Sequence, residues 1–387
     1  MRRHLPALLL ALALVVAALV IATRRDGDGE RTAVGDTGRS ISTSTTTSTQ
    51  SSTPAESVVR GPRGSDRPVT FAFAGDVQFP DQWYTEPGLV PPSAPTLAAQ
   101  LAAAPKHVLD PIAPVLSSAD VTVVNLETAI TERGEPVAGK NYHFRSTPSA
   151  FTALESAGVD VVSMANNHVL DYGPVGMEDT FEAVEHAGVP VIGIGRSASE
   201  AFQPYRTKVH GQRIAVIAAL DWLEPNLVDS WTATDTQPGV AMSIDRSRLL
   251  ASVRAVRPDV DTLVVFLHWG TEETHCASSE QQDLAAELIE AGADLVVGSH
   301  AHRVFGAGRT GTSLVAYGLG NFVYFREDGE SGRSGVLLAT VTGREVDDYS
   351  WVPARITNGV PVPAMGPAAA ADLAEWEDRR VCSGIGP

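Results

Sequence analysis

The feature that most constrains the fold is a unit that occurs three times along the chain. Each copy has an amphipathic stretch, then an Ala-Gly pair, then an apolar run of five or six residues. The copies occupy residues 153–164, 183–194 and 288–297. Glycine directly after a helical stretch is a common helix stop, and short apolar runs fit buried strands. Helices that alternate with buried strands predict an α/β protein with a layered sheet.

Further apolar runs predict more strands. They occupy residues 69–74, 120–124, 213–219, 260–267, 314–317 and 335–341. We expect the last three or four of them to pair antiparallel in a second sheet. Hydrophobic residues make up 43% of the chain and charged residues 19%, a balance typical of a globular protein. The folded domain is predicted at residues 67–387.

The N-terminal segment predicts an exported protein. Residues 5–22 form an apolar run between two pairs of arginines, at the short end of the about 17–25 residues that span a membrane. We expect residues 1–25 to be an uncleaved signal anchor that holds the protein at the cell membrane with its domain outside the cytoplasm. A cleaved signal peptide, giving a secreted protein, is the alternative. Residues 26–66, rich in Gly, Ser and Thr, are expected to form a disordered tether.

Charge and composition exclude several classes of function. The formal net charge is −17, and because the first 25 residues hold four arginines and no acidic residue, the rest of the chain carries −21. A body this negative has no electrostatic reason to bind nucleic acid. No G-x-G-x-x-G or P-loop motif follows a strand, so no nucleotide-binding fold is predicted. Two cysteines are too few for a disulfide scaffold or a cysteine-based zinc site.

Small polar clusters follow one predicted strand after another. The clusters are Gly75-Asp76, Asn125-Leu126-Glu127, Asn166-Asn167-His168, His268-Trp269-Gly270, Gly298-Ser299-His300-Ala301-His302 and Gly320-Asn321. Taken singly, each has an ordinary explanation as a turn, a helix cap or a buried histidine. Taken together they favour one shared site, because ligands of open α/β sheets bind at the carboxyl ends of the strands.

The side chains in these clusters are typical of a metal centre. They offer two carboxylates, one amide oxygen and three imidazoles, from Asp76, Glu127, Asn167, His268, His300 and His302. A mixed oxygen and nitrogen set without thiolate suits Mn²⁺, Zn²⁺, Fe or Co²⁺. Six ligands are too many for one tetrahedral ion. They predict two divalent ions about 3.5–4 Å apart, bridged by a carboxylate, an arrangement used in phosphoester hydrolysis.

The ordered motifs resemble those of the CapA family, the poly-gamma-glutamate capsule synthesis proteins, which are similar to calcineurin-like metallophosphoesterases. The resemblance runs from about residue 69 to residue 341 and includes Asp171-Tyr172-Gly173 and Thr271-Glu272 beside the six clusters. It implies a four-layer α/β/β/α sandwich with the metal site at one edge of the sheets. It also implies involvement with an anionic cell-surface polymer.

The resemblance implies a role for each candidate ligand. Asp76 and His302 would hold one ion, Asn167, His268 and His300 the other, and Glu127 would bridge the two. Two positions depart from the superfamily pattern. Gln78 stands where a histidine usually follows the first aspartate, and Glu127 replaces an aspartate. The departures predict weaker binding of one ion.

Two further residues are candidates for the chemistry itself. The resemblance implies that His168 lies near the leaving group, where it would act as a general acid; a supporting role or a helix cap is the alternative. Asp171 is expected to orient His168. Arg145 is the natural clamp for a substrate anion, unless it lies on an exposed loop.

Cys276 and Cys382 are expected to form a disulfide, because the export prediction puts them in an oxidising compartment. Closing a loop of about 100 residues stabilises a fold by about 4–5 kcal/mol on the chain-entropy description. The bridge would hold the C-terminal segment near the metal site.

Two functions remain open at this point. One is a metal-dependent hydrolase, acting on a phosphoester or an amide in the metabolism of a cell-surface polymer. The other is a non-catalytic export or assembly subunit whose metal cleft grips a carboxylate polymer. Repulsion from the −21 body would confine such a grip to the metals and Arg145. The sequence gives no indication of the oligomeric state.

Overall fold

The computed structural model describes residues 67–79 and 94–387, all within the compact unit Val58–Pro387. The predicted anchor at 1–25 and the tether at 26–66 lie outside the described residues. Within 67–79 and 94–387, no helix combines the length and the hydropathy needed to cross a membrane.

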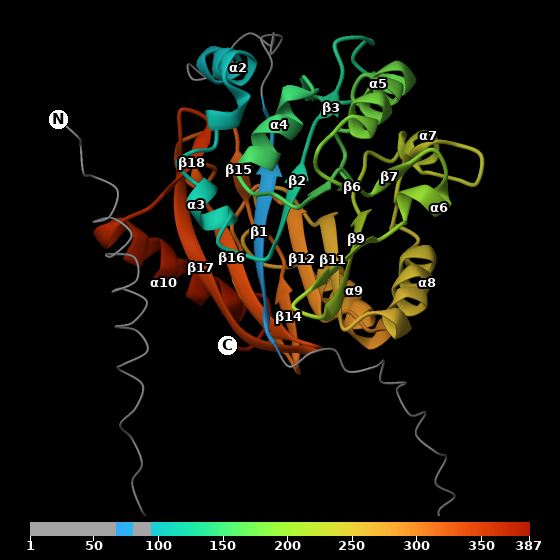
Figure 1. Cartoon of the computed structure of the whole chain (residues 1–387). Coiled ribbons are helices and arrows are strands. Elements are labelled where there is room, and N and C mark those ends of the chain that lie inside the picture. Colours follow the sequence, from blue (N-terminus) through green and yellow to red (C-terminus); the bar gives the residue numbers. More distant parts are fainter. Residues whose placement is uncertain (1–66, 80–93) are drawn as a thin grey trace, which may run out of the picture. The chain divides into compact units, whose positions relative to one another are not determined.

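The larger sheet has eight strands and is built around β1 (Val69–Val77). Its order is β18 (Val360–Pro363), β17 (Glu345–Thr357), β16 (Arg333–Thr342), β1, β2 (Val121–Leu126), β5 (Val161–Ser163) and β6 (Val191–Ile192), with β15 (Asn321–Val323) beside the end of β1. From β1 to β6 the strands run parallel, whereas β16, β17 and β18 pair antiparallel. Figure 1 shows β1 between β2 and β16.

The second sheet has six strands. Its order is β13 (Ala307–Thr310), β14 (Ser313–Ala316), β12 (Leu295–His300), β11 (Thr262–Trp269), β9 (Gln212–Leu220) and β8 (Tyr205–Val209). The four central strands run parallel, and only the edge strands β8 and β13 pair antiparallel. The expectation of an antiparallel second sheet is therefore wrong. The connections from β9 to β11 and from β11 to β12 include helices, whereas β12 reaches β14 through β13. Residues 335–341 belong to β16 in the larger sheet.

Helices and short bridging strands occupy the connections. The helices are α2 (Ala94–Ala103), α3 (Ala113–Leu116), α4 (Ser149–Ser156), α5 (Gly173–Glu185), α6 (Ala198–Ala201), α7 (Val228–Trp231), α8 (Arg246–Val256), α9 (Ser279–Ala291) and α10 (Gly366–Cys382), with 3-10 turns η1 (Pro105–His107) and η2 (Arg257–Asp259). The short strands β3 (Ala129–Ile130) and β4 (Arg145–Ser146) pair with each other, as do β7 (Ile194–Gly195) and β10 (Gly239–Val240).

Two of the three predicted glycine stops are confirmed. Gly292 ends α9 in the left-handed region at φ 119°, and Gly158 follows α4 at φ 90°. At both positions a side chain would be strained, which explains the glycine. α5 instead ends at Glu185, before Gly188.

The core shows why the apolar runs alternate with helices. On β11, Val264 and Phe266 pack in one cluster with Phe73 of β1, whereas Val265 packs in a second cluster with Leu284 of α9. Successive residues of a strand face opposite sides, so one face of the six-stranded sheet meets the larger sheet's core and the other meets helices. The α/β class is confirmed. The full order of four layers stays a prediction.

Candidate metal centre

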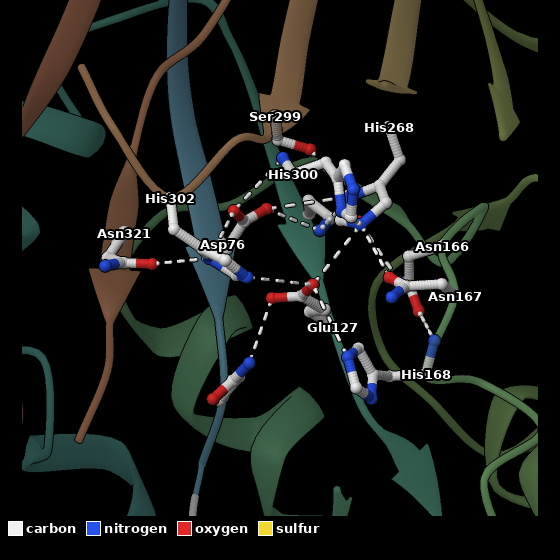
Figure 2. A network of polar contacts seen from close by, with 12 residues as sticks. Asp76, Glu127, Asn166, Asn167, His168, His268, Ser299, His300, His302 and Asn321 are labelled. Carbon is white, nitrogen blue, oxygen red and sulfur yellow. Dashed lines mark hydrogen bonds and ion pairs between the residues drawn. The ribbon is translucent and has the colours of Figure 1, made fainter. Parts of the chain in front are cut away.

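The predicted ligands come together at the ends of five strands, β1, β2 and β5 of the larger sheet and β11 and β12 of the second. In the larger sheet Asp76 of β1 lies in register with Asn125 of β2 and Asn321 of β15. A Cβ on Gly75 would lie 1.9 Å from the Gly320 carbonyl oxygen, so this close approach of the two chains requires glycine. Figure 2 shows side chains from β1, β2, β11 and β12 pointing at one another around Glu127.

One group of ligands, the imidazole-rich subsite, consists of Glu127, Asn167, His268 and His300. His268 Nε2 lies 2.8 Å from Asn167 Oδ1, 3.1 Å from His300 Nδ1 and 3.2 Å from Glu127 Oε1. The four side chains are almost fully buried. One carboxylate, one amide oxygen and two imidazoles at these separations form a complete four-ligand set for a divalent ion.

The other group, the carboxylate-rich subsite, consists of Asp76, Glu127 and His302. His302 Nδ1 lies 3.4 Å from Asp76 Oδ2, and His302 Nε2 lies 4.0 Å from Glu127 Oε1. Within this group, and within Glu127, His268 and His300, the ligand atoms all lie within 4.8 Å of one another. Glu127 is the residue that the two groups share.

The backbone after β12 is bent to present both histidines. His300 has φ 89° and His302 has φ 53°, conformations that non-glycine residues rarely adopt. Such residues cost about 1–3 kcal/mol each and cluster at functional sites. The strain is consistent with a site whose geometry matters more than its local stability.

Electrostatics show that the buried site favours positive charge. Burial acts to raise the pKa of Glu127, but His302 and then His268 outweigh it and lower the value to about 2. Burial acts to lower the pKa of His302, but Glu127 and Asp76 raise it to about 9. The positive charge of a protonated His302 thus takes the place of a cation between the carboxylates of Asp76 and Glu127. Burial, reinforced by His268, keeps the pKa of His300 well below its usual range, so His300 is a neutral imidazole as a metal ligand must be.

The residues fit a metal pair. Glu127 Oε1 and His300 Nε2 are buried and have no hydrogen bond of ordinary geometry within the described part of the chain. The ion-pair partners of Asp76 and Glu127 in that part are the histidines His168, His268 and His302. Buried carboxylates are normally paired or coordinate metals, and two of these imidazoles, His268 and His302, are themselves candidate ligands.

Three supporting residues received no role from the sequence. Asn125 donates from Nδ2 to Asp76 Oδ1 over 2.8 Å, and Ser299 Oγ lies 3.0 Å from His268 Nδ1. Asn321 Oδ1 lies 2.8 Å from His302 Nδ1. Partners of this kind set the tautomer and orientation of metal-binding imidazoles. The signal was present, because all three lie inside the strand-end clusters.

Asp221 is a residue that sequence reasoning missed altogether. It follows β9 directly, its backbone N–H donates to the His268 carbonyl over 2.9 Å, and its carboxylate accepts from Ser243 Oγ over 3.1 Å. Burial raises its pKa to about 6, against the hydrogen bond from Ser243. The next residue, Trp222, stacks on His300 with ring centroids 4.7 Å apart. The strand-end rule that found the other clusters also applies to Leu220-Asp221-Trp222.

His168 is held by a buried chain of polar contacts. Its Nδ1 lies 2.6 Å from Asp171 Oδ2, and Asp171 Oδ1 pairs with Lys140 Nζ over 2.8 Å. Its Nε2 lies 4.0 Å from Glu127 Oε1. Burial lowers the pKa of His168, and Asp171 opposes the shift. Burial likewise acts to raise the pKa of Asp171, but His168 and Lys140 lower it. Asp171 therefore orients His168 as expected, and Lys140 neutralises the pair.

The motif order, now joined in space, is that of one family. The chain belongs to the bacterial capsule synthesis protein PGA_cap family. The family profile matches residues 70–325, which include all six predicted ligands. The resemblance to CapA proteins inferred from the motifs is confirmed.

Individual relatives support the family assignment over part of their length. The capsule biosynthesis protein CapA of Bacillus anthracis is 28% identical over 264 residues, 66% of this chain and 63% of the relative. The PGA biosynthesis protein CapA of Bacillus subtilis is 28% identical over 215 residues, 55% of each chain. The matches thus span less than two thirds of these relatives.

Solved structures with similar folds are more distant. The NAD nucleotidase of Haemophilus influenzae has a TM-score of 0.43 at 12% identity, covering 82% of this chain and 64% of its own. The 5'-nucleotidase of Candida albicans has a TM-score of 0.42 at 12% identity, covering 83% of this chain and 59% of its own.

Arg145 and the cysteines lie outside the ligand groups. Arg145 is on β4, with its guanidinium carbon 4.6 Å from the centre of the Tyr172 ring; its role as an anion clamp stays a prediction. A disulfide joins Cys276 to Cys382, which closes the predicted loop. The disulfide ties the exposed segment after β11 to the end of α10. The end of α10 lies beyond the region matched by the family profile.

Proposed function

We propose that this PGA_cap protein is a metal-dependent hydrolase that acts in the synthesis or processing of a polyglutamate-like cell-surface polymer. The observation that carries the proposal is Glu127, a buried carboxylate shared by two groups of ligands. The names of the relatives support the biological setting, since both concern capsule or PGA biosynthesis. A phosphoester is the substrate class that a bridged metal pair suits best.

Two bound divalent ions would supply Lewis-acid activation of the substrate and of the attacking water. The side chains of the protein supply the rest. Asp171 accepts a hydrogen bond from His168 Nδ1–H, so Nε2 is the nitrogen free to exchange a proton with the leaving oxygen. Lys140, which pairs with Asp171 and also contacts the Asn167 carbonyl, ties this relay to the imidazole-rich subsite.

The setting outside the cytoplasm is part of the proposal. It supposes that residues 1–25 anchor the protein in the cell membrane, so that the domain meets the polymer at the outer face. A disulfide between Cys276 and Cys382 suits an oxidising compartment.

A non-catalytic subunit that grips a carboxylate polymer is the second candidate. One observation favours it. Gln78 occupies the position of a usual ligand histidine and contacts Glu127 instead of offering an imidazole. A site kept for binding would tolerate this change more easily than one kept for turnover.

The experiment is an assay of the purified protein with Mn²⁺ on a generic phosphodiester and a generic monoester. The hydrolase proposal expects turnover that His300→Ala abolishes. His107→Ala is the matched control, because it removes an exposed imidazole that belongs to neither group of ligands. Mn²⁺ binding without turnover would favour the subunit, and no binding of any divalent ion would refute both.

A further inference from the structure

Gln78 makes a hydrogen bond to Glu127, the carboxylate that the two subsites share. It follows β1 directly and is buried, and its Nε2 lies 3.0 Å from Glu127 Oε2. A carboxylate oxygen only accepts, so the amide nitrogen faces Glu127. This orientation leaves Gln78 Oε1 buried without a partner within the described part of the chain. The charge-assisted bond to Glu127 compensates for the unpaired oxygen.

The backbone of Val77-Gln78 also holds the main chain of Glu127 at the end of β1. The Glu127 N–H donates to the Val77 carbonyl over 2.9 Å, and the Gln78 N–H donates to the Val323 carbonyl over 2.7 Å. Backbone and side chain of Glu127 are therefore both fixed to the end of β1. An amide on such a rigid support can set the torsions of its partner.

The two oxygens of Glu127 consequently have different surroundings. Oε2 faces the Gln78 amide, whereas Oε1 lies 3.2 Å from His268 Nε2 and 4.0 Å from His302 Nε2. Figure 2 shows the carboxylate oriented in this way, with His268 and His302 on the side of one oxygen. Only Oε1 is placed to serve both the imidazole-rich and the carboxylate-rich subsite.

The geometry points to Gln78 as a positioning residue that makes Glu127 a bridge through a single oxygen atom. The inference rests on the proposed metal centre and adds how one carboxylate would serve both subsites. Glutamate has one more torsion than aspartate and two equivalent oxygens. Left free, it could chelate one ion or bind each ion through a different oxygen. Because the Gln78 amide engages Oε2, Oε1 would be the oxygen left to serve both subsites.

The test uses the full chain and Mn²⁺, followed by calorimetric titration and electron paramagnetic resonance. Gln78→Met keeps the length of the side chain and removes the donor. The wild type should bind two ions whose spectrum shows exchange coupling. In the variant, affinity for one ion should fall by about 10- to 100-fold, the range seen when a residue supporting a metal ligand is removed, and the coupled spectrum should be lost.

Gln212→Met is the matched control. Gln212 is also a buried glutamine, but its side-chain oxygen accepts from the Gly343 backbone N–H, away from the ligands. Its substitution should change neither stoichiometry nor spectrum. Gln78→Asn provides a second variant that keeps an amide one methylene too short to reach Glu127, and the same losses are expected. Circular dichroism checks that each variant is folded.

The possible failures are distinguishable. If the wild type binds two coupled ions and both Gln78 variants match it, Gln78 has no positioning role and the proposed function stands. If the wild type binds no Mn²⁺, the metal centre itself is refuted and the role of Gln78 with it.

Discussion

The two subsites share Glu127 but differ in what surrounds it. The imidazole-rich subsite adds two imidazoles and an amide, all buried. The carboxylate-rich subsite adds the charge of Asp76 and one imidazole, His302, whose side chain is 12% exposed and lies 4.0 Å from Glu127 Oε1. The imidazole-rich subsite lacks only the cation. In the carboxylate-rich subsite the proton of His302 occupies the place of the cation.

Because of this difference, we expect the two ions to bind with different affinities. The imidazole-rich subsite offers four ligands and the carboxylate-rich subsite three, so the first can bind an ion through more atoms. In the carboxylate-rich subsite a metal must displace the proton of His302, so its apparent affinity depends on pH. We therefore expect a tighter ion in the imidazole-rich subsite and a weaker, pH-sensitive ion in the other.

The largest effect is expected from Glu127→Gln, which keeps the shape and removes the charge. Because both subsites use Glu127, affinity for both ions should fall by at least about 100-fold, beyond the loss typical of a supporting residue. Metal content measured by plasma mass spectrometry after dialysis is the test. Glu155→Gln, at an exposed glutamate of α4, should retain both ions. Loss of one ion alone would assign Glu127 to a single subsite and end the description of a shared bridge.

The second effect separates the subsites. His268→Ala should remove the tighter ion, since His268 contacts Asn167, His300 and Glu127 at once. His302→Ala should remove the weaker ion and leave the tighter one within about tenfold of its original affinity. Calorimetric titration with Mn²⁺ distinguishes the two patterns. If either variant loses both ions, the subsites are coupled more strongly than the geometry indicates.

The sequence predicted the convergence of the site better than the pairing of the strands. Asp76, Glu127, His268 and His300 were found because each lies at the end of an apolar run, and parallel strands bring such ends to one edge. The direction of β14 was not predictable, because its apolar run has no feature that distinguishes a parallel partner from an antiparallel one.

The sequence also could not predict which side chains would interact across segments. The bond between Gln78 and Glu127 joins two strands through torsions that no spacing determines. Gln78 therefore stood out only as a missing histidine. Asp171 could be predicted to orient His168 because it is three residues away, whereas Lys140, which neutralises the pair, is 28 residues earlier than His168 and on another segment.

The third effect is a pH dependence of the metal-free protein. The folded pKa of His302, about 9, exceeds the ordinary histidine value of 6.5, so its contribution to stability is complete below pH 6.5 and is lost as the pH rises toward 9. We expect the free energy of unfolding to fall by about 2 kcal/mol over this interval. Urea unfolding after chelation measures it. The slope should flatten in His302→Gln, and a chelated wild type equally stable at pH 6.5 and 9 would show that His302 does not hold the proton.

The smallest effect comes from the residues that orient the histidines. Asn321 is fixed by its own Nδ2, which donates to the Ser331 carbonyl over 3.0 Å, so its Oδ1 accepts from His302 Nδ1 and leaves Nε2 for the metal. Asn321→Ala should weaken only the carboxylate-rich subsite, by about tenfold. Ser299→Ala is the reciprocal variant and should weaken only the imidazole-rich subsite. Titration of both variants with Mn²⁺ reads out the two affinities separately. A loss that appears in the same subsite for both variants would contradict the division of the centre into two groups, since the two residues contact different imidazoles.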